Sequence, residues 1–593
     1  MTTLATRTTG AMAARPPIDS ITLEIIRHQL AAIPNQIERN IERTAFSPLV
    51  YEYKDYSVGF VDPVGRLVVQ SRGSLPIFVA NALGTAVREG LEVLGPDHIH
   101  DGDIVVTNNP AWLGQHLNNV VAYTPVRVEG ELIGFFAVLV HWVDVGGSVP
   151  GSCVASNTTD VWQEGLQLPT LKLLERGRKR PELFRLIAAN TRFPAFLLGD
   201  VEAQIAGCQT GHDLVQEITA RHGLEAVKAA IVAMWDGADH AVKAALARAR
   251  PGTYIARAEL DDDGVTPDRR VPVDISVTLS AEEILVDLSG LGPQTAGPFN
   301  AGRNGGGIAA ARIACKYMFS PDTPVNDGDF RRLRVEIPDG RFLSASPDAA
   351  IGHSGSTVPT VVDAILNAFG QALPERAAAA HHGIYGIHAF DGRNPETGER
   401  FQHLDTVTGG WGATAVADGP SPYRSNGHGD VPDVPVEMQE SFFPYRIEAK
   451  RLRPDSGGVG RHRGGLGVEK VYRILGDCRL VVGFDRVACP PWGVHGGGAG
   501  LSASVEILRA NGTRESFSKG ERRLSAGDFV YVRSGGGGGF GPAVERAVEE
   551  VLRDVRLGYV SREGAERDYG VVLSDDGIDE AATAARRSTM SSR

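Results

Sequence analysis

Predicted β-strands follow one another along this sequence in groups, without a helix between them. Apolar runs separated by turn residues lie at 104–107, 119–128 and 132–140, and again at 254–260, 271–279 and 283–288. Parallel strands need a long, usually helical crossover, whereas antiparallel strands are joined directly by short turns. The fold class that we predict is therefore α+β: a large, intergrown multidomain protein with mostly antiparallel sheets and peripheral helices.

Helical patterns flank these groups of strands. An amphipathic helix is predicted at 19–43, and Pro34 is expected to kink or interrupt it. Residues 212–250 are Ala-rich and predict two helices, broken at His222-Gly223 or at Asp236-Gly237. Two shorter helices are predicted at 361–373 and 543–557.

Composition changes along the 593 residues divide the chain into regions. We expect a disordered N-terminus at 1–18, an α+β domain with the candidate metal site at 19–250, a central α+β domain at 251–400, a glycine-rich, β-dominated region ending in a helix at 401–572, and a flexible tail at 573–593. The 71 glycines are roughly 12% of the chain against a usual ~7%. This excess indicates many tight turns in a β-rich scaffold, and the run Gly535–Gly539 is expected to be a loop or a packing feature.

Charge, hydropathy and cysteine usage exclude several classes of protein. The net charge of −12 repels phosphate backbones and anionic lipid, so neither nucleic acid nor a membrane is expected as a partner. No run of 18 apolar residues occurs and the N-terminus lacks the apolar core of a secretory signal, so we expect a cytoplasmic protein. The five cysteines form no C-x-x-C pair, which argues against a disulfide framework and against a thiolate zinc site.

The segment from 103 to 151 holds the candidate site. In an antiparallel meander of its three strands, the start of the second and the end of the third share one edge, which brings together His116, Asn119, His141 and Asp144. Two imidazoles with oxygen-bearing neighbours suit an open site for Zn²⁺, Mn²⁺ or Fe²⁺. The residues alone leave an alternative open, in which His116 caps a loop, His141 is a hydrogen-bonded histidine at a strand end and Asp144 belongs to a turn.

Other motifs in the sequence give weaker evidence for a binding or catalytic site. No G-x-x-x-x-G-K-[ST] sequence occurs, so this chain is not expected to bind ATP through a P-loop. The loop Gly302–Gly307 either offers backbone N–H groups to an anion or serves only for close backbone approach, and we favour the second. The sequence Gly352-His353-Ser354-Gly355 lacks the G-x-S-x-G spacing of a nucleophile elbow.

Several ordered blocks resemble one known family. Asn108-Asn109-Pro110, followed by Gly114-Gln115-His116-Leu117-Asn118-Asn119, is similar to the N-D-P-Y-x-G-G-T-H-L-P-D signature of the hydantoinase B/oxoprolinase family. The segment from His141 to Gly147 (HWVDVGG) resembles that family's A-H-x-x-D-[VI]-G-G. Further similar blocks, spread between residues 18 and 572, are QEGL at 163–166, NTR at 190–192, PVNDG at 324–328, GGWGA at 409–413, PVE at 435–437, RPDSGG at 453–458 and RGGLG at 463–467.

The resemblance implies one chain of an ATP-dependent enzyme that acts on a small-molecule substrate within a hetero-oligomer. ATP is used by a hydantoinase A-type partner subunit, which phosphorylates the substrate oxygen, and the B-type chain completes the reaction at a divalent metal. The implied metal ligands are Asp55, in a segment similar to the family's E-R-R-D-F-S, together with His116, Asn119 and His141. Asp144 is the candidate catalytic residue, expected to orient a ligand histidine.

Two positions depart from the family's motifs. This chain has Asn109 and Asn119 where the resemblance leads us to expect aspartates, and an amide oxygen brings no charge to a cation. We expect weaker metal binding as a result. Three functions stay open: a B-type subunit of an amidohydrolase that opens a cyclic amide of the hydantoin, oxoproline or lactam type, a subunit of an ATP-dependent ketone carboxylase of the acetone or acetophenone type, and a non-metallated structural or regulatory subunit.

Overall fold

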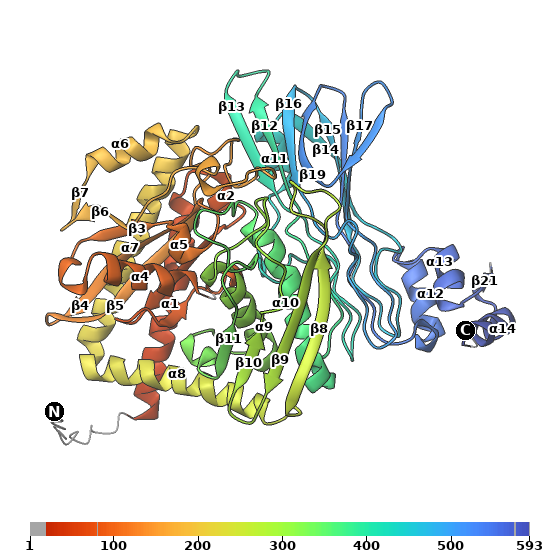
Figure 1. Ribbon diagram of the computed structural model, residues 1–593, viewed down its shortest axis with the longest axis horizontal. Coiled ribbons are helices and arrows are strands. Elements are labelled where there is room, and N and C mark those ends of the chain that lie inside the picture. Colours follow the sequence, from red (N-terminus) through yellow and green to blue (C-terminus); the bar gives the residue numbers. More distant parts are fainter. Residues whose placement is uncertain (1–18, 80, 575–576, 592–593) are drawn as a thin grey trace.

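The computed structural model describes residues 19–593 except 80, 575–576 and 592–593. The N-terminal segment 1–18, for which we expected disorder, lies outside the described residues. Figure 1 shows sheets of mostly antiparallel strands with helices on their faces, and the C-terminal helices project from the main body. Of the pairs between named strands, β10–β11 alone is parallel in the described part of the chain, so the predicted α+β class with antiparallel sheets is confirmed.

A seven-stranded sheet forms the N-terminal part and contains the predicted meander. Its strand order is β2-β1-β5-β4-β3-β6-β7, and each neighbouring pair is antiparallel. The strands are β1 (Tyr56–Val61), β2 (Leu67–Gln70), β3 (Ile104–Thr107), β4 (Asn119–Val128), β5 (Glu131–His141), β6 (Leu171–Glu175) and β7 (Arg178–Lys179). The central strand β5 buries both faces, since Phe136, Val138 and Val140 join one apolar core while Phe135, Ala137 and Leu139 join another.

Long helices cover one face of this sheet. They are α1 (Ser20–Thr44), α7 (Pro194–His222) and α8 (Leu224–Leu246), while α4 (Ala82–Val93) packs on the opposite face. The predicted break at Gly223 is confirmed, but α1 continues through Pro34 instead of being interrupted there. Its buried residues, among them Leu30, Ile33 and Ile37, pack against the sheet on both sides of the proline. This packing compensates for the hydrogen bond that proline cannot donate.

The central part pairs a four-stranded sheet with two helices. The strand order is β11-β10-β9-β8, from β8 (Gly252–Leu260), β9 (Val271–Leu279), β10 (Ile284–Asp287) and β11 (Leu333–Glu336). The helix α9 (Ala309–Phe319) packs beside α10 (Ser354–Ala372), which contacts β8 and β9. The helix α10 begins seven residues earlier than the predicted 361, at Ser354, and this earlier start brings Ser354 close to the candidate site.

Two further sheets pack face to face in the C-terminal part. One has the order β13-β12-β16-β19, from β12 (Ile387–Arg393), β13 (Arg400–Asp405), β16 (Cys478–Gly483) and β19 (Lys519–Leu524). The other has the order β14-β15-β20-β17-β18, from β14 (Tyr445–Leu452), β15 (Val468–Ile474), β17 (Ser504–Leu508), β18 (Arg514–Phe517) and β20 (Phe529–Arg533). Because β12 pairs with both β13 and β16, the boundary expected at residue 400 falls inside one sheet.

Glycine-rich segments lie side by side next to these sheets, and Figure 1 shows them as long extended runs without helices. Gly537 donates to Gly465 O at 2.9 Å, and Gly465 donates to Trp411 O at 2.8 Å. A Cβ added to Gly537 would lie 2.0 Å from Trp411 O, and one added to Gly536 would lie 1.9 Å from Ser456 O. Much of the glycine excess therefore permits backbones to touch, in addition to the tight turns that we expected, and Gly535–Gly539 is a packing feature.

Short helices complete the chain, and the C-terminal ones correct two expectations. The helix predicted at 543–557 is a 3₁₀ turn, Ala543–Glu545, followed by α12 (Val548–Arg556). The tail predicted to be flexible contains α14 (Glu580–Ser591), whose Arg587 donates to the backbone oxygens of Tyr569 and Arg546. The others are α2 (Pro48–Tyr51), α3 (Pro76–Val79), α5 (Pro110–Leu113), α6 (Pro181–Ala189), α11 (Val436–Phe442) and α13 (Arg562–Tyr569), with β21 (Leu573–Ser574) and β22 (Gly577–Ile578) as a small ribbon.

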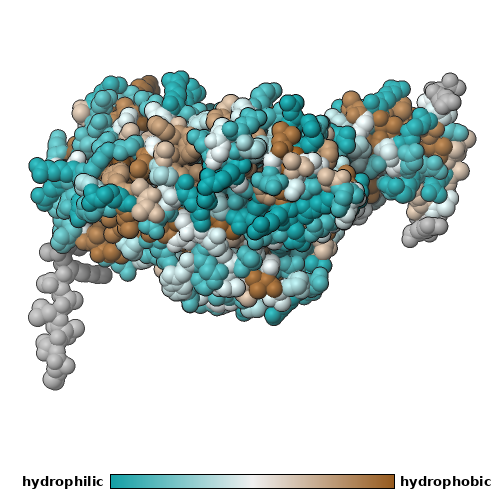
Figure 2. All heavy atoms as spheres, turned by 90° about the horizontal axis from the view of Figure 1, so that it is seen from above, coloured by the Kyte–Doolittle hydropathy of each residue, from teal (hydrophilic) through white to brown (hydrophobic). Residues whose placement is uncertain are grey.

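The surface in Figure 2 mixes hydrophilic and hydrophobic residues over the main body and the projecting C-terminal helices. Within the described ranges, no helix is both long enough and apolar enough to span a bilayer.

The contact between α7 and β5 gives a test of this packing. A Cβ at Gly211 would lie 2.2 Å from the Phe136 ring, whereas a Cβ at the exposed Gly237 of α8 meets no atom within 4 Å. We expect Gly211→Ala to destabilise the protein by about 1–3 kcal/mol, because the buried ring has to move. Gly237→Ala, the matched control, should be neutral or stabilising by up to ~1 kcal/mol. Thermal unfolding followed by calorimetry measures both, and equal midpoints for the two variants would contradict this packing.

Candidate metal centre

The edge of the seven-stranded sheet brings three of the predicted residues together. Asn119 is the first residue of β4 and pairs directly with His141, the last residue of β5. Asp55 precedes β1, whose Tyr56 pairs with Val140, and the Asp55 carbonyl accepts a hydrogen bond from His141 N at 3.0 Å. The antiparallel register therefore places all three side chains at one end of neighbouring strands.

His116 reaches the same place from the loop between α5 and β4. Gly114 ends α5 with a φ of +65°, a conformation that favours glycine. Its carbonyl accepts a hydrogen bond from Gly302 N at 3.0 Å, and a Cβ on Gly302 would lie 2.6 Å from Gly114 Cα. The Gly302–Gly307 loop thus serves close backbone approach, as we favoured, and it supports the turn that presents His116.

These side chains line a small cavity of about 30 Å³, which is room for one or two waters. The His116 and His141 ring centroids are 5.1 Å apart. Asp55, Asn119 and His141 are buried, and all four predicted ligand residues contribute to the cavity wall. The structure therefore brings the predicted metal ligands into one pocket.

Each of these four residues has a buried polar atom without a hydrogen-bond partner in the described part of the chain. The atoms are Asp55 Oδ1, His116 Nε2, Asn119 Oδ1 and His141 Nδ1. Buried polar atoms in proteins almost always have a partner, because an unpaired one costs about 1–3 kcal/mol. Four residues that line one cavity each carry such an atom, and a cation is one group that accepts electron pairs from carboxylate, amide and imidazole alike.

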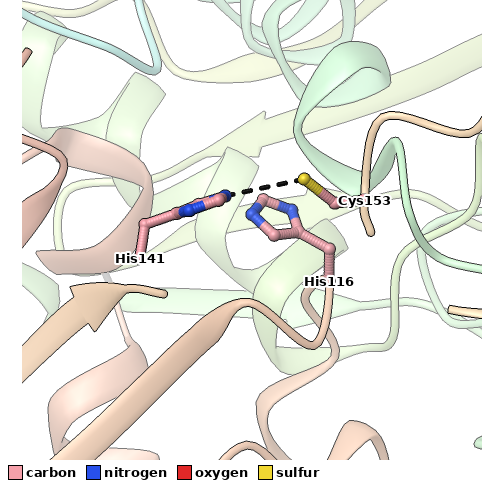
Figure 3. Close-up of side chains that lie close together, drawn as sticks. All are labelled: His116, His141 and Cys153. Atoms are coloured by element: carbon pink, nitrogen blue, oxygen red, sulfur yellow. Dashed lines mark hydrogen bonds between the residues drawn. The ribbon is translucent and has the colours of Figure 1, made fainter. Parts of the chain in front are cut away.

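Cys153 is a further polar residue of the cavity, which the sequence did not single out. Its Sγ lies 3.5 Å from His141 Nε2, and Figure 3 shows its thiol close to the His116 and His141 rings. One ligand atom from each of these three residues lies within 4.8 Å of the other two. The expectation of no thiolate site rested on the missing C-x-x-C pair. The sequence feature that could have indicated Cys153 as a site residue is its position, twelve residues after His141 and close to the same segment.

Burial sets the protonation of these groups. It lowers the pKa of His141 to about 4 and that of His116 well below its usual range, so both rings are neutral at pH 7 and offer a lone pair. Burial also raises the pKa of the Asp55 carboxyl to about 7 and that of the Cys153 thiol well above its usual range. A bound cation would oppose the shift at Asp55, because opposite charge favours the ionised carboxylate.

Asp144 does not have the position expected of a group that orients a ligand histidine. Its buried carboxylate accepts hydrogen bonds from Gly151 N and Ser152 Oγ, both at 3.1 Å, and from Arg192 N at 2.7 Å and Nη1 at 2.8 Å. It therefore fixes the loop that leads to Cys153. The side chain that contacts a ring nitrogen of His116 is Ser354, whose Oγ lies 3.3 Å from Nδ1.

Of the two departures from the motifs, one lies at the cavity. Asn119 contributes to the wall, as expected. Asn109 instead caps α5, because its Oδ1 accepts from Ala111 N at 3.1 Å and its Nδ2 donates to Glu89 at 2.7 Å. The site therefore has one carboxylate fewer than the motif predicts, and not two.

The opposite wall of the cavity comes from the C-terminal half of the chain. Tyr385 and His428 stack with ring centroids 3.6 Å apart, and Tyr385 Oη and His428 Nδ1 also lack a hydrogen-bond partner. Tyr53 Oη lies 2.6 Å from Thr406 Oγ1 and joins the two halves. The pocket is thus complete only when both halves of the chain are folded together.

This fold and pocket define a large α+β protein with paired histidines at a sheet edge. The chain belongs to the hydantoinase B/oxoprolinase family, whose model matches residues 19–543. It is 28% identical to the B-type chain of a putative D-/L-hydantoinase from a Pseudomonas species, over 94% of this chain and 96% of that protein.

Two solved structures share this fold, and one of them is also similar in sequence. The ATP-dependent caprolactamase of Pseudomonas jessenii superposes with a TM-score of 0.89 at 29% identity, over 97% of this chain and 100% of the other. An acetone carboxylase matches with a TM-score of 0.87 at 22% identity, over 96% of this chain and 83% of the other, which is a likeness of fold.

The partners of Asp144 predict the effect of replacing it. Asp144→Asn removes a buried charge from Arg192 and leaves donors unpaired, so we expect a loss of about 3–5 kcal/mol and faster amide hydrogen exchange in residues 145–153. The exposed Asp213→Asn in α7 is the control and should change neither. An Asp144→Asn protein with an unchanged unfolding temperature and unchanged loop exchange, but without bound metal, would instead support the direct role expected from the sequence.

Proposed function

We propose that this chain is the B-type subunit of an ATP-dependent amidohydrolase that opens a cyclic amide of the hydantoin, oxoproline or lactam type. In this proposal ATP is used by a hydantoinase A-type partner subunit, which phosphorylates the amide oxygen. The observation that carries the proposal is a cavity lined by four motif residues, each with a buried polar atom that lacks a hydrogen-bond partner among the described residues. These residues occupy motif positions of a family whose model matches residues 19–543. The similarity to the B-type chain of a hydantoinase and to a caprolactamase supports the class of reaction.

The residues of the cavity fit a divalent cation. Asp55, His116 and His141, with the amide oxygen of Asn119, would hold Zn²⁺, Mn²⁺ or Fe²⁺, since both imidazoles are neutral at pH 7. Such an ion would act as a Lewis acid and would lower the pKa of a bound water to ~7.

The chain's own residues prepare the site for an activated amide. Leu75, Ile77 and Phe78 form an apolar part of the wall, which excludes bulk water and strengthens electrostatic interactions inside. Burial keeps the pKa of Tyr385 well above its usual range, so its hydroxyl retains the proton and can donate a hydrogen bond to an oxygen atom that enters the cavity. Phosphorylation of the amide oxygen removes the resonance that makes the C–N bond inert. In the proposal the partner subunit carries out this ATP-dependent step, which is consistent with the lack of a P-loop motif in this sequence.

The proposed complex is a cytoplasmic hetero-oligomer. A ketone carboxylase subunit is the alternative with a specific observation behind it, namely the fold shared with an acetone carboxylase. A non-metallated regulatory subunit is the remaining alternative, and the loss of one carboxylate at Asn119 favours it.

A reconstituted complex distinguishes these activities. We expect the full-length chain, mixed with its A-type partner, to open hydantoin, 5-oxoproline or caprolactam only in the presence of ATP and to release ADP. Product formation followed by mass spectrometry should be independent of bicarbonate, because the attacking group is water. A requirement for bicarbonate with a ketone substrate would replace this proposal by the carboxylase.

Removal of a ligand histidine should abolish both metal binding and turnover. We expect His116→Ala and His141→Ala each to lower the metal content of the purified chain to near zero while the circular dichroism spectrum stays unchanged, because the loss is local to the cavity. His240→Ala, at an exposed position of α8, is the control and should retain metal and turnover. Metal is measured by plasma mass spectrometry, and full metal content in both cavity variants would contradict the proposed ligands.

Asn119→Asp restores the carboxylate that the family motif predicts. We expect it to raise the affinity for a divalent metal by ~10–100-fold, the size of effect seen when groups around a metal are changed. Asn109→Asp repairs the other departure but faces Glu89 outside the cavity, so it should leave the affinity unchanged. Competition with a chelator measures both, and zero metal in the parent and in Asn119→Asp would favour the regulatory subunit.

A further inference from the structure

We propose that Cys153 is itself a ligand, so that this cavity binds a thiolate-preferring ion such as Zn²⁺ in preference to Mn²⁺ or Mg²⁺. The proposed ligand set is Cys153 with His116 and His141, the three residues whose ligand atoms lie within 4.8 Å of one another. Asp55 lies outside this cluster but lines the same cavity and contributes negative charge there. This inference rests on the metal site of the proposed function and deepens it, because it names the class of metal.

The distance between the thiol and a histidine has the value that a shared ion would impose. A tetrahedral zinc has Zn–S of about 2.3 Å and Zn–N of about 2.0 Å, which separates the two ligand atoms by roughly 3.5 Å. Cys153 Sγ and His141 Nε2 are 3.5 Å apart. His116 supplies a third ligand atom within 4.8 Å of both, and its Nε2 is the unpartnered ring nitrogen.

The charges of the cavity favour a thiolate ligand. Asn119 is neutral at the position where the motif predicts a carboxylate, so Asp55 alone would leave one charge of a divalent ion unbalanced. A Cys153 thiolate supplies the second negative charge without widening the cavity. The exchange of a hard carboxylate oxygen for a soft sulfur also changes the preference, because thiolates favour zinc while carboxylates suit magnesium and manganese.

The backbone around Cys153 is fixed in a way that suits a ligand. Cys153 N donates to Asn118 Oδ1 at 3.3 Å, and Asn118 Nδ2 donates to Trp142 O at 2.6 Å. Asn118 is adjacent to Asn119, and Trp142 is adjacent to His141, so one side chain connects Cys153 to the residues beside two cavity positions. On the other side of Cys153, Asp144 holds Gly151 and Ser152. Ligands held by such surrounding contacts bind a metal with little reorganisation.

A simple hydrogen bond between Cys153 and His141 explains less of the site. It would leave His116 Nε2 without a partner and Asp55 Oδ1 without a neighbouring positive charge, among the described residues. Cys208, in contrast, is a fully buried cysteine whose Sγ donates to Ala122 O at 3.4 Å, a normal position for a core thiol. Cys208 is therefore a matched control for Cys153.

Cobalt substitution tests the proposed ligand directly. Co²⁺ loaded into the full-length chain should give an intense near-ultraviolet band from thiolate-to-cobalt charge transfer. We expect Cys153→Ser and Cys153→Ala to lose this band while circular dichroism and thermal unfolding show a folded protein. Cys208→Ser should keep it.

Metal competition gives a second readout that does not depend on activity. The ratio of Zn²⁺ to Mn²⁺ bound from an equimolar mixture should fall by ~10–100-fold in the double variant Cys153→Ser with Asn119→Asp, which replaces sulfur by oxygen. An unchanged ratio would overturn the proposal.

The outcomes separate this inference from the proposed function. Co²⁺ that binds, is lost in His116→Ala and gives no charge-transfer band would overturn the thiolate ligand while leaving the metal-dependent hydrolase intact. Failure of the chain to bind Co²⁺ or Zn²⁺ would overturn both the thiolate ligand and the metal site. ATP-dependent ring opening by a complex whose charge-transfer band disappears in Cys153→Ser would support the two together.

Discussion

The register of one antiparallel pair, Asn119 opposite His141, is the constraint on which the site depends. Side chains alternate between the two faces of a strand, so a slip of one residue would turn either side chain away from the cavity. The register is fixed by the core, because alternate residues of β5 fill two different apolar clusters. The cavity residues are thus held in place by the apolar packing of the two clusters, which extend far beyond the site.

The remainder of the pocket is assembled from distant parts of the chain. Ser354 at the start of α10 contacts His116, while Tyr385 and His428 from the C-terminal half close the opposite wall. The glycine-rich segments lie within that same half, where hydrogen bonds between backbones in contact replace side-chain packing. Such contacts leave no room for a Cβ, so the glycine-rich segments are closely packed. Close packing keeps Tyr385 and His428 in a fixed position relative to the strand ends that carry Asn119 and His141.

The chemistry of the cavity follows from burial more than from charge. Desolvation keeps both imidazoles neutral and disfavours ionisation of Asp55 and Cys153. Buried polar atoms without partners are costly, and a water or a cation in this cavity of about 30 Å³ would satisfy them. This chain has Asn119 where the family motif has a carboxylate, and Cys153 lines the same cavity.

Local patterns determined the parts of this protein that depend on neighbouring residues. The meander of β3, β4 and β5, the break at Gly223, the family motifs and the convergence of His116, Asn119 and His141 follow from alternation, turn residues and spacing along one segment. Tertiary structure alone decided the place of Cys153 and Ser354, the partners of Asp144, the role of Asn109 as a cap and the continuation of α1 through Pro34. Each of these features depends on which distant segments pack against one another. Such long-range contacts produce no periodic pattern in the sequence, so local patterns cannot predict them.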